Sequence, residues 1–254
     1  STLFLNENSK IQELEYCYYL KNEMNIGRTA TRNFLAQKAK FNILLFLDSD
    51  VLPENKSFLS TYGEAFDNLE NKAIFGGYKY VSEVPEESHS LRYYYGKSRE
   101  EKEALIRNRN PYGFVFSGNM LIPKDVFLEN NYKKAANLYG LDIIFSHQLY
   151  NNKIQVTHID NAIFHLGLEE NEVFFNKSLA SVKSRKELLS DNKQAAEINS
   201  LLRYYQILKK LRLLFFVKTL FKFSERYLKK HIIAKKTNLF YFDLYRLGYI
   251  CYIK

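Results

Sequence analysis

A short apolar run, Phe41–Leu47, constrains the fold of this chain more than any other segment. It reads FNILLFL and ends abruptly at the polar sequence Asp48-Ser49-Asp50. A run of this kind, after a helical pattern and before a polar turn, is typical of a strand buried on both faces of a parallel sheet. The segment before it, Thr29–Lys40, predicts an amphipathic helix whose apolar stripe contains Ala30, Phe34, Leu35 and Ala39.

Helical and extended patterns alternate along the first 165 residues. Further helices are expected within Leu3–Leu20, Lys56–Asn68, Lys124–Asn130 and Gly140–Tyr150. Further strands are expected at Tyr18–Leu20, at Ala73–Val81 and at Phe114–Pro123, the last interrupted at Ser117-Gly118-Asn119. A strand pair or one kinked strand is expected at Ile154–Phe164, and a helix-containing excursion at Pro85–Asn110. This alternation predicts an α/β sandwich.

Composition narrows the class of protein. The chain has 254 residues, of which 46% are apolar, so it can bury a sizeable core. Two cysteines, Cys17 and Cys251, are too few for a disulfide scaffold or a multi-cysteine zinc module. No apolar run approaches the ~20 residues of a membrane span, and the sequence begins with no signal-peptide pattern.

The charge is unevenly distributed along the chain. The formal net charge is +9, which suggests an anionic partner. Residues 201–254 hold 13 Lys and Arg against 2 acidic residues, whereas residues 1–200 hold 24 against 26. The chain is therefore a near-neutral body with a strongly basic tail.

The two aspartates after the apolar run are the strongest candidates for chemistry. Ligands of open α/β sheets bind at the carboxyl ends of strands, where Asp48 and Asp50 would lie. Carboxylate oxygens suit Mg²⁺ or Mn²⁺, which bridges to substrate phosphates. The alternative is a solubilising turn, because Asp and Ser are common turn residues.

The residues upstream of the aspartates carry a resemblance to a known family. The segment from Asn25 to Asp50 reads NIGRTATRNFLAQKAKFNILLFLDSD. It resembles the bacterial family-2 glycosyltransferases of the A-type fold, whose pattern is approximately N-x-G-x-x-x-A-R-N, a helix, and an apolar strand ending in D-x-D. Thr31 stands where a small residue such as Ala is usual. Three later segments continue the resemblance: FSGNMLIPKDVF (Phe116–Phe127), YGLDIIFSHQL (Tyr139–Leu149) and NAIFHLGLEENEVFFNKS (Asn161–Ser178).

The resemblance covers about residues 15–185 and implies a fold and a domain organisation. The fold would be the A-type nucleotide-sugar glycosyltransferase fold, a mixed and mostly parallel sheet flanked by helices. The catalytic domain would span 1–185 and a basic amphipathic helical tail 186–254. The family has two strands and a helix before the matched region, so the resemblance also implies a domain truncated at its N-terminus, or one in which another element replaces these strands.

The resemblance assigns a role to each matching residue. Asp50 would coordinate Mn²⁺ or Mg²⁺, and His165 would be a second metal ligand or a contact to the diphosphate, against the alternative of a strand-end histidine. Asp48 would face the ribose or sugar of the donor. The remaining donor-pocket residues would be Asn25, Gly27 and Arg32, where Arg32 pairs with phosphate or holds an aspartate. The acceptor side would be formed by Ser117, Gly118 and Asn119.

The resemblance makes Asp142 the general base of a direct displacement with inversion at the anomeric carbon. The base removes the proton of the acceptor hydroxyl as its oxygen attacks. The alternative is a helix N-terminal acid favoured by the helix dipole. The usual Glu of the family's E-D motif is replaced by Leu141, which implies a different acceptor or a weakened enzyme.

The segment Leu201–Lys236 predicts one or two amphipathic helices in the tail. A basic helix with bulky Phe, Leu and Tyr residues suits an anionic membrane surface. The alternative is that its apolar face packs on the body and its bases face solvent.

Three functions remain open at this stage. The first is an inverting transferase that moves a sugar from a nucleotide-sugar, expected to be a UDP-sugar, to a saccharide or lipid-linked acceptor in cell-surface polysaccharide synthesis. It would be cytoplasmic and peripheral at the inner face of the membrane. The second is a non-catalytic family member that acts as a membrane-associated partner. The third is a nucleic-acid-binding protein, disfavoured because no such motif is present and the body is not basic.

Overall fold

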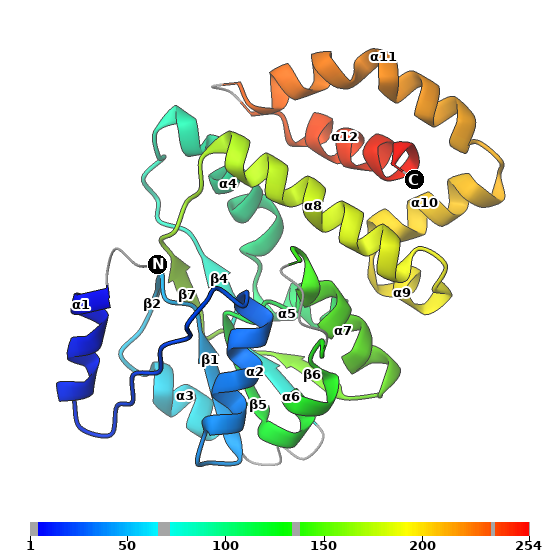
Figure 1. Ribbon diagram of the computed structural model, residues 1–254. Helices are drawn as coiled ribbons and strands as arrows, with labels where there is room; N and C mark the ends of the chain where they lie inside the picture. The colour runs from blue at the N-terminus through cyan, green and yellow to red at the C-terminus, as the bar shows by residue number, and fades with distance from the viewer. Residues whose placement is uncertain (1–4, 66–71, 134–137, 235–236, 254) are drawn as a thin grey trace.

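The protein has a mixed α/β fold built on a four-stranded sheet, as a computed structural model of residues 5–65, 72–133, 138–234 and 237–253 shows (Figure 1). The strands lie in the order β1-β5-β3-β6, with bounds β1 Ile43–Leu47, β5 Asn119–Pro123, β3 Lys72–Phe75 and β6 Gln155–His158. β5 runs antiparallel to both of its neighbours, and β3 and β6 are the one parallel pair among the described strands of this sheet. The expectation of a mostly parallel sheet is therefore wrong for the strand pairs, although β1, β3 and β6 point in one direction.

A second sheet of three short strands continues from the carboxyl end of β1. Its order is β2-β7-β4, with β2 at Val51–Pro53, β7 at Ile163–His165 and β4 at Tyr78–Lys79. β4 and β7 pair in parallel. β2 pairs antiparallel with β7 in a register that sets Val51 opposite His165. This pairing brings the end of the predicted strand Ile154–Phe164 beside the two aspartates.

Two predicted strands divide between the two sheets. Ala73–Val81 becomes β3 and β4, which separate at Gly76-Gly77, where Gly77 has φ +89°. Ile154–Phe164 becomes β6 and β7. The predicted strand Phe114–Pro123 keeps only its second half as β5, because Pro111–Phe114 forms a 3-10 turn.

Helices cover both faces of the four-stranded sheet. On one face lie α2 (Arg28–Lys38), α6 (Lys124–Asn130) and α7 (Leu141–Asn151), and they share a core with Phe46, Phe75, Met120 and Ile122. On the other face, α3 (Phe58–Glu64) and the second sheet pack around Phe58, Tyr62, Ile74 and Leu121. Opposite faces of one sheet thus belong to two cores, as the pleat of a strand requires.

The excursion between β4 and β5 contains short helical elements. They are a 3-10 turn at Glu87–His89, α4 at Ser90–Tyr95, a π-turn at Gly96–Glu100 and α5 at Ala104–Arg107. At the start of the chain, α1 spans Leu5–Ser9 and a 3-10 turn spans Lys10–Glu13. The strand expected at Tyr18–Leu20 does not form.

The stripe expected on α2 differs from the side that the helix buries. Its buried residues are Arg32 and Ala36, whereas Leu35, a member of the expected stripe, is 43% exposed. A charged residue takes a buried position because carboxylates lie opposite it.

Five helices form the C-terminal part of the chain, with bounds α8 Asn171–Leu189, α9 Lys193–Ile198, α10 Ser200–Lys210, α11 Leu214–Ile232 and α12 Leu239–Tyr252. In Figure 1, α8 lies between the sheet-containing body and the pair α11 and α12. Leu141 and Ile144 of α7 share a core with α8 to α10 and α12, so these helices pack on the body. The expected boundary at residue 185 falls inside α8. No described helix is both long and apolar enough to cross a bilayer.

Candidate functional site

The predicted site residues gather around a cleft of about 1180 Å³ between the α/β body and the C-terminal helices. One wall contains the turn before α2, the residues after β1, the start of α7 and the end of β7, with Asp48, Asp50, Asp142 and His165. The other wall contains side chains of α4, α8, α10 and α12. Residues that are far apart in the sequence thus face one space.

Two arginines of α2 form ion pairs with two aspartates of other elements. Nη2 of Arg28 lies 2.5 Å from Oδ2 of Asp142, and Nη1 lies 3.7 Å from Oδ2 of Asp48. Nη2 of Arg32 lies 2.5 Å from Oδ1 of Asp48. Because residues four apart share one face of a helix, both guanidinium groups reach the same pair of carboxylates. The two charges of each sign balance.

Asp142 is the second residue of α7, where the helix dipole favours a negative charge. Oγ of Ser117 donates to Oδ1 of Asp142 at 2.5 Å and accepts a hydrogen bond from Arg32. Burial alone would raise the pKa of Asp142, but Arg28, Arg32 and Ser117 outweigh burial and hold that pKa below its ordinary value. Asp142 is therefore ionised at neutral pH and already engaged by three groups.

Asp50 and His165 face each other across the β2–β7 pair. Oδ2 of Asp50 lies 3.9 Å from Nε2 of His165, which is beyond hydrogen-bond distance. Burial and the nearby Arg92 lower the pKa of His165, so its ring is neutral at pH 7. Nδ1 of His165 is buried without a hydrogen-bond partner among the described residues.

Asp50 and His165 fit a divalent ion that takes its other ligands from a substrate. Mg²⁺ usually takes one or two protein carboxylates and completes its shell with water and phosphate oxygens, and a neutral imidazole also suits Mn²⁺. Asp50 is 46% exposed in its side chain, so a phosphate can approach it. In the part of the chain that the structure describes, no three His, Cys, Asp or Glu residues form a metal site on their own.

Two glycines leave the space that the aspartate carboxylates occupy. A Cβ atom on Gly167 would lie 1.8 Å from Oδ2 of Asp50, and one on Gly118 would lie 2.1 Å from Oδ2 of Asp48. Both distances are far below van der Waals contact. Any larger residue at either position would therefore displace the carboxylate beside it.

The remaining donor-pocket candidates differ in their access to the cleft. Asn25 and Gly27 line it and form the turn that starts α2, where Oδ1 of Asn25 accepts from the backbone N–H of Gly27 at 2.9 Å. Arg32 is 8% exposed and does not line the cleft, because Asp48 and Ser117 hold it below the surface. Of the two interpretations for Arg32, the structure favours the one in which it holds an aspartate.

The three acceptor-side candidates have different environments. Ser117 belongs to the hydrogen-bonded network of Asp142, and Gly118 lies against Asp48. Asn119 is 1% exposed, and its Nδ2 donates to the carbonyls of Gly77 and Asn161, both at 2.9 Å. Asn119 therefore ties β5 to the second sheet and does not reach the cleft.

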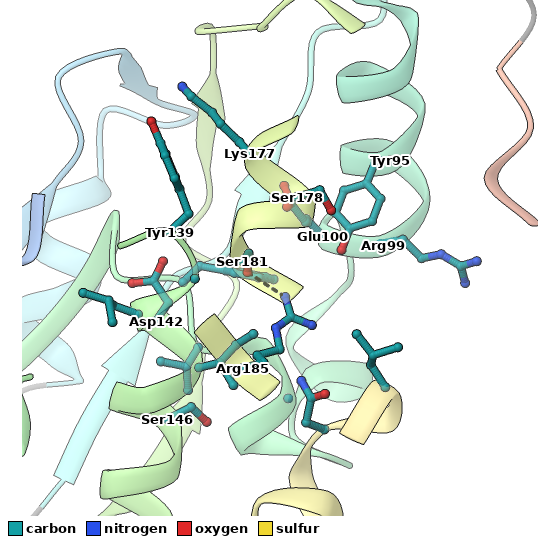
Figure 2. A pocket seen from close by; sticks show the side chains of 18 of the residues that line it. Tyr95, Arg99, Glu100, Tyr139, Asp142, Ser146, Lys177, Ser178, Ser181 and Arg185 are labelled. Carbon is teal, nitrogen blue, oxygen red and sulfur yellow. Dashed lines mark hydrogen bonds between the residues drawn. The ribbon is translucent and has the colours of Figure 1, made fainter. Parts of the chain in front are cut away.

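The sequence analysis missed Arg28 and the far wall of the cleft. Arg28 could have been found from its spacing, because it precedes Arg32 by one helical turn. The far wall carries a group of arginines, Arg92, Arg99, Arg185 and Arg246. Figure 2 shows Arg185 and Asp142 lining one pocket, with Ser181 hydrogen-bonded to Arg185. No sequence motif points to these arginines, which come from four helical elements: α4, the π-turn Gly96–Glu100, α8 and α12.

No model of a known protein family matches this chain, and no curated protein matches it in sequence. The interpretation of the cleft therefore depends on its geometry. One cleft is lined by Asp50 and His165, which fit a divalent ion, by the cation Arg28, and by the ionised Asp142 at the start of α7. Such a site can bind a phosphate-bearing substrate and remove a proton beside it.

Proposed function

We propose that the protein is a metal-dependent inverting glycosyltransferase of the A-type fold that uses a nucleotide-sugar donor. The observation that carries the proposal is the meeting of Asp48, Asp50 and Asp142 in one cleft with Arg28. Asp48 and Asp50 follow a strand of the central sheet, and Asp142 opens a helix on one of its faces. A displacement on a nucleotide-sugar needs acidic groups in two roles, one on the leaving-group side and one as the base, and these residues come from different elements of the fold.

Asp50 and His165 would hold Mn²⁺ or Mg²⁺, which supplies positive charge to the leaving diphosphate. Arg28 lies within reach of both aspartates and is 56% exposed in its side chain, so it can turn toward a phosphate. When Arg28 leaves Asp142, the carboxylate loses an opposing charge and becomes a stronger base. Binding of the donor thereby prepares the proton acceptor.

The proposed reaction is a single displacement. The acceptor hydroxyl oxygen forms a bond to the anomeric carbon while Oδ2 of Asp142 accepts its proton. The bond between the anomeric carbon and the diphosphate oxygen breaks, and the nucleoside diphosphate leaves with the electron pair. Ser117 keeps its hydrogen bond to Oδ1 of Asp142 and so fixes the orientation of the carboxylate.

The test is turnover of a panel of UDP-, GDP- and CMP-sugars with Mn²⁺, measured as release of the free nucleotide. We expect turnover of at least one donor, its loss on chelation of the metal, and its loss in Asp50→Asn. Asp191→Asn is the matched control, because Asp191 is an exposed aspartate on the loop after α8. The absence of turnover for every donor, with Mn²⁺ binding unchanged in Asp50→Asn, would favour the non-catalytic alternative.

The outer face of α11 supports the proposal that the protein docks on an anionic membrane surface. Four large apolar side chains recur at helical spacing and face solvent: Phe216, Leu220, Phe223 and Tyr227, with 67%, 69%, 83% and 56% exposure. Three bases flank them, Lys222, Arg226 and Lys230. The helix packs a different face on α12 through Phe221, Leu228 and Ile232. An apolar stripe beside a row of bases matches acyl chains below anionic headgroups.

Vesicle sedimentation tests the docking of α11. We expect the double substitution Phe216→Ser/Phe223→Ser to weaken binding to phosphatidylglycerol vesicles at least about tenfold, because each ring contributes about 1.5–3 kcal/mol when buried. Leu59→Ser/Leu105→Ser is the matched control, because these residues are 69% and 67% exposed elsewhere on the body. Equal loss in both double variants, or concentration-dependent self-association that only the α11 variant abolishes, would contradict membrane docking.

A further inference from the structure

Arg185 on α8 is a cation that has no carboxylate partner in the part of the chain that the structure describes. Its one hydrogen bond runs from Nη2 to Oγ of Ser181 at 3.0 Å. Its Nε is buried without a hydrogen-bond partner among the described residues, although the side chain as a whole is partly exposed. A guanidinium that loses part of its contact with water is normally paired, because an isolated charge loses hydration without compensation. An unpaired one that lines a cleft therefore points to a missing anion.

The groups around Arg185 add positive charge. Arg246 on α12 and Arg99 both pair with Asp243, and the Arg99–Asp243 distance is 2.5 Å. Arg99, Arg185 and Arg246 line the cleft with this one shared carboxylate, so the group has two positive charges in excess. Burial and the neighbouring Arg246 lower the pKa of Arg185 to about 10. Because this pKa is still above 7, Arg185 carries its charge at neutral pH.

The unpaired arginine is connected to the proposed base through a close helix contact. A Cβ atom on Gly140 would lie 2.0 Å from Oγ of Ser181, so α8 approaches the backbone just before α7. Asp142 follows Gly140 by two residues. Arg28 reaches Asp142 from α2, whereas Ser181 and Arg185 approach the same helix start from α8. A second group can thus occupy the α8 side while a donor occupies the α2 side.

We propose that Arg185, with Ser181 and Arg246, binds a phosphate group of the acceptor. A phosphate monoester carries about −1.5 to −2 charges and has three acceptor oxygens, which match the forked donors of two guanidinium groups and a hydroxyl. A carboxylate has two oxygens and one charge, so it would engage fewer of these donors. The assignment of the phosphate to an acceptor rests on the proposed function. The phosphate site itself does not depend on that function.

Calorimetric titration with phenyl phosphate in metal-free buffer tests the site without any turnover. We expect Arg185→Gln to weaken binding at least about tenfold, because a charge-assisted hydrogen bond contributes about 1.5–3 kcal/mol. Arg185→Lys should recover part of the affinity. Arg203→Gln is the matched control on α10, because Arg203 is exposed on the same cleft, and it should bind as the wild type does. Circular dichroism establishes that each variant is folded.

An experiment with vesicles distinguishes a lipid-borne phosphate from a soluble phosphate ester. Phosphatidylcholine vesicles with and without dihexadecyl phosphate compare a lipid-borne phosphate with the soluble ester, and dependence on Arg185 in either arm supports the site. Wild-type affinity in Arg185→Gln in both arms, or phenylacetate bound as tightly as phenyl phosphate, would overturn it. Asp142→Asn should retain phosphate binding. Arg185-dependent binding in a protein that turns over no donor would remove the proposed function and leave the phosphate site.

Discussion

The two ends of the cleft treat their arginines differently. At the α2 end, Arg28 lies 2.5 Å from Asp142 and Arg32 lies 2.5 Å from Asp48. The two positive and two negative charges therefore cancel. At the α8 end, Arg185 has no described carboxylate, and Arg99 and Arg246 share one. Matched charges hold elements together, whereas unmatched charges are a cost that a ligand can remove. The α2 end is therefore internally neutral, whereas the α8 end leaves positive charge that a ligand could compensate.

The largest expected effect separates the ends by reaction rate. Asp142→Asn keeps the shape of the side chain and removes its ability to accept a proton, so the transfer rate should fall by about 10²–10⁴-fold. Arg185→Gln should raise the KM for a phosphorylated acceptor and leave kcat within a few-fold. Steady-state kinetics of both variants measure the difference. A fall in kcat of the same size in both would remove the distinction between the two ends.

The second effect separates the ends by stability. Arg32→Gln leaves the partly buried carboxylate of Asp48 without its nearest cation and should lower the free energy of unfolding by about 3 kcal/mol. Arg185→Gln removes an unpaired charge and should be neutral or stabilising in phosphate-free buffer. Urea unfolding of the two variants provides the comparison. Similar losses in both would mean that Arg185 has a partner of its own in the folded protein.

A third effect concerns the contact between the two ends. Gly140 has φ +82° and lies against Ser181, so Gly140→Ala should cost about 1–3 kcal/mol of folding stability and weaken phosphate binding. Gly63→Ala is the control, because Gly63 lies in α3 with nothing within 4 Å of an added Cβ, and it should be neutral or slightly stabilising. Unchanged phosphate affinity in folded Gly140→Ala would separate α7 from the phosphate site.

The smallest effect is the acid dependence of stability at the α2 end. The folded-state pKa of Asp142 lies below its ordinary value near 3.8, so the ionised form stabilises the folded protein. This contribution is complete above about pH 5 and is lost as the pH falls through the folded-state pKa. Asp142→Asn should therefore lose less stability than the wild type between pH 5 and pH 3. Parallel pH profiles would show that Asp142 is not held by Arg28 in solution.

The local patterns predicted the elements that carry the α2 end. The apolar run before Asp48, the helical period before it and the helix that Asp142 opens are properties of neighbouring residues. They also predicted the α6 helix at Lys124–Asn130 with its observed bounds. The C-terminal helix α12 was not predicted, although one or two helices were expected in Leu201–Lys236, where the structure has α10 and α11.

The division of extended segments between two sheets has one physical cause. Ala73–Val81 looks like one strand but contributes β3 and β4 to different sheets, and Ile154–Phe164, for which a strand pair was one expectation, contributes β6 and β7. Which strand pairs with which depends on contacts between residues far apart in sequence, and a local period does not contain them. The same limit applies to the stripe of α2, where the aspartates opposite Arg32 make a buried charge favourable.

The sequence by itself determined that carboxylates would follow a strand and open a helix, because strand ends and helix starts are set by nearby residues. It also determined that the tail would carry the excess of positive charge. Only the tertiary structure decided that His165 lies 3.9 Å from Asp50 through the β2–β7 pair. It also decided which arginines pair with a carboxylate, because such pairs form between side chains that distant elements bring together. No feature of the local sequence distinguishes Arg185 from Arg32 in this respect.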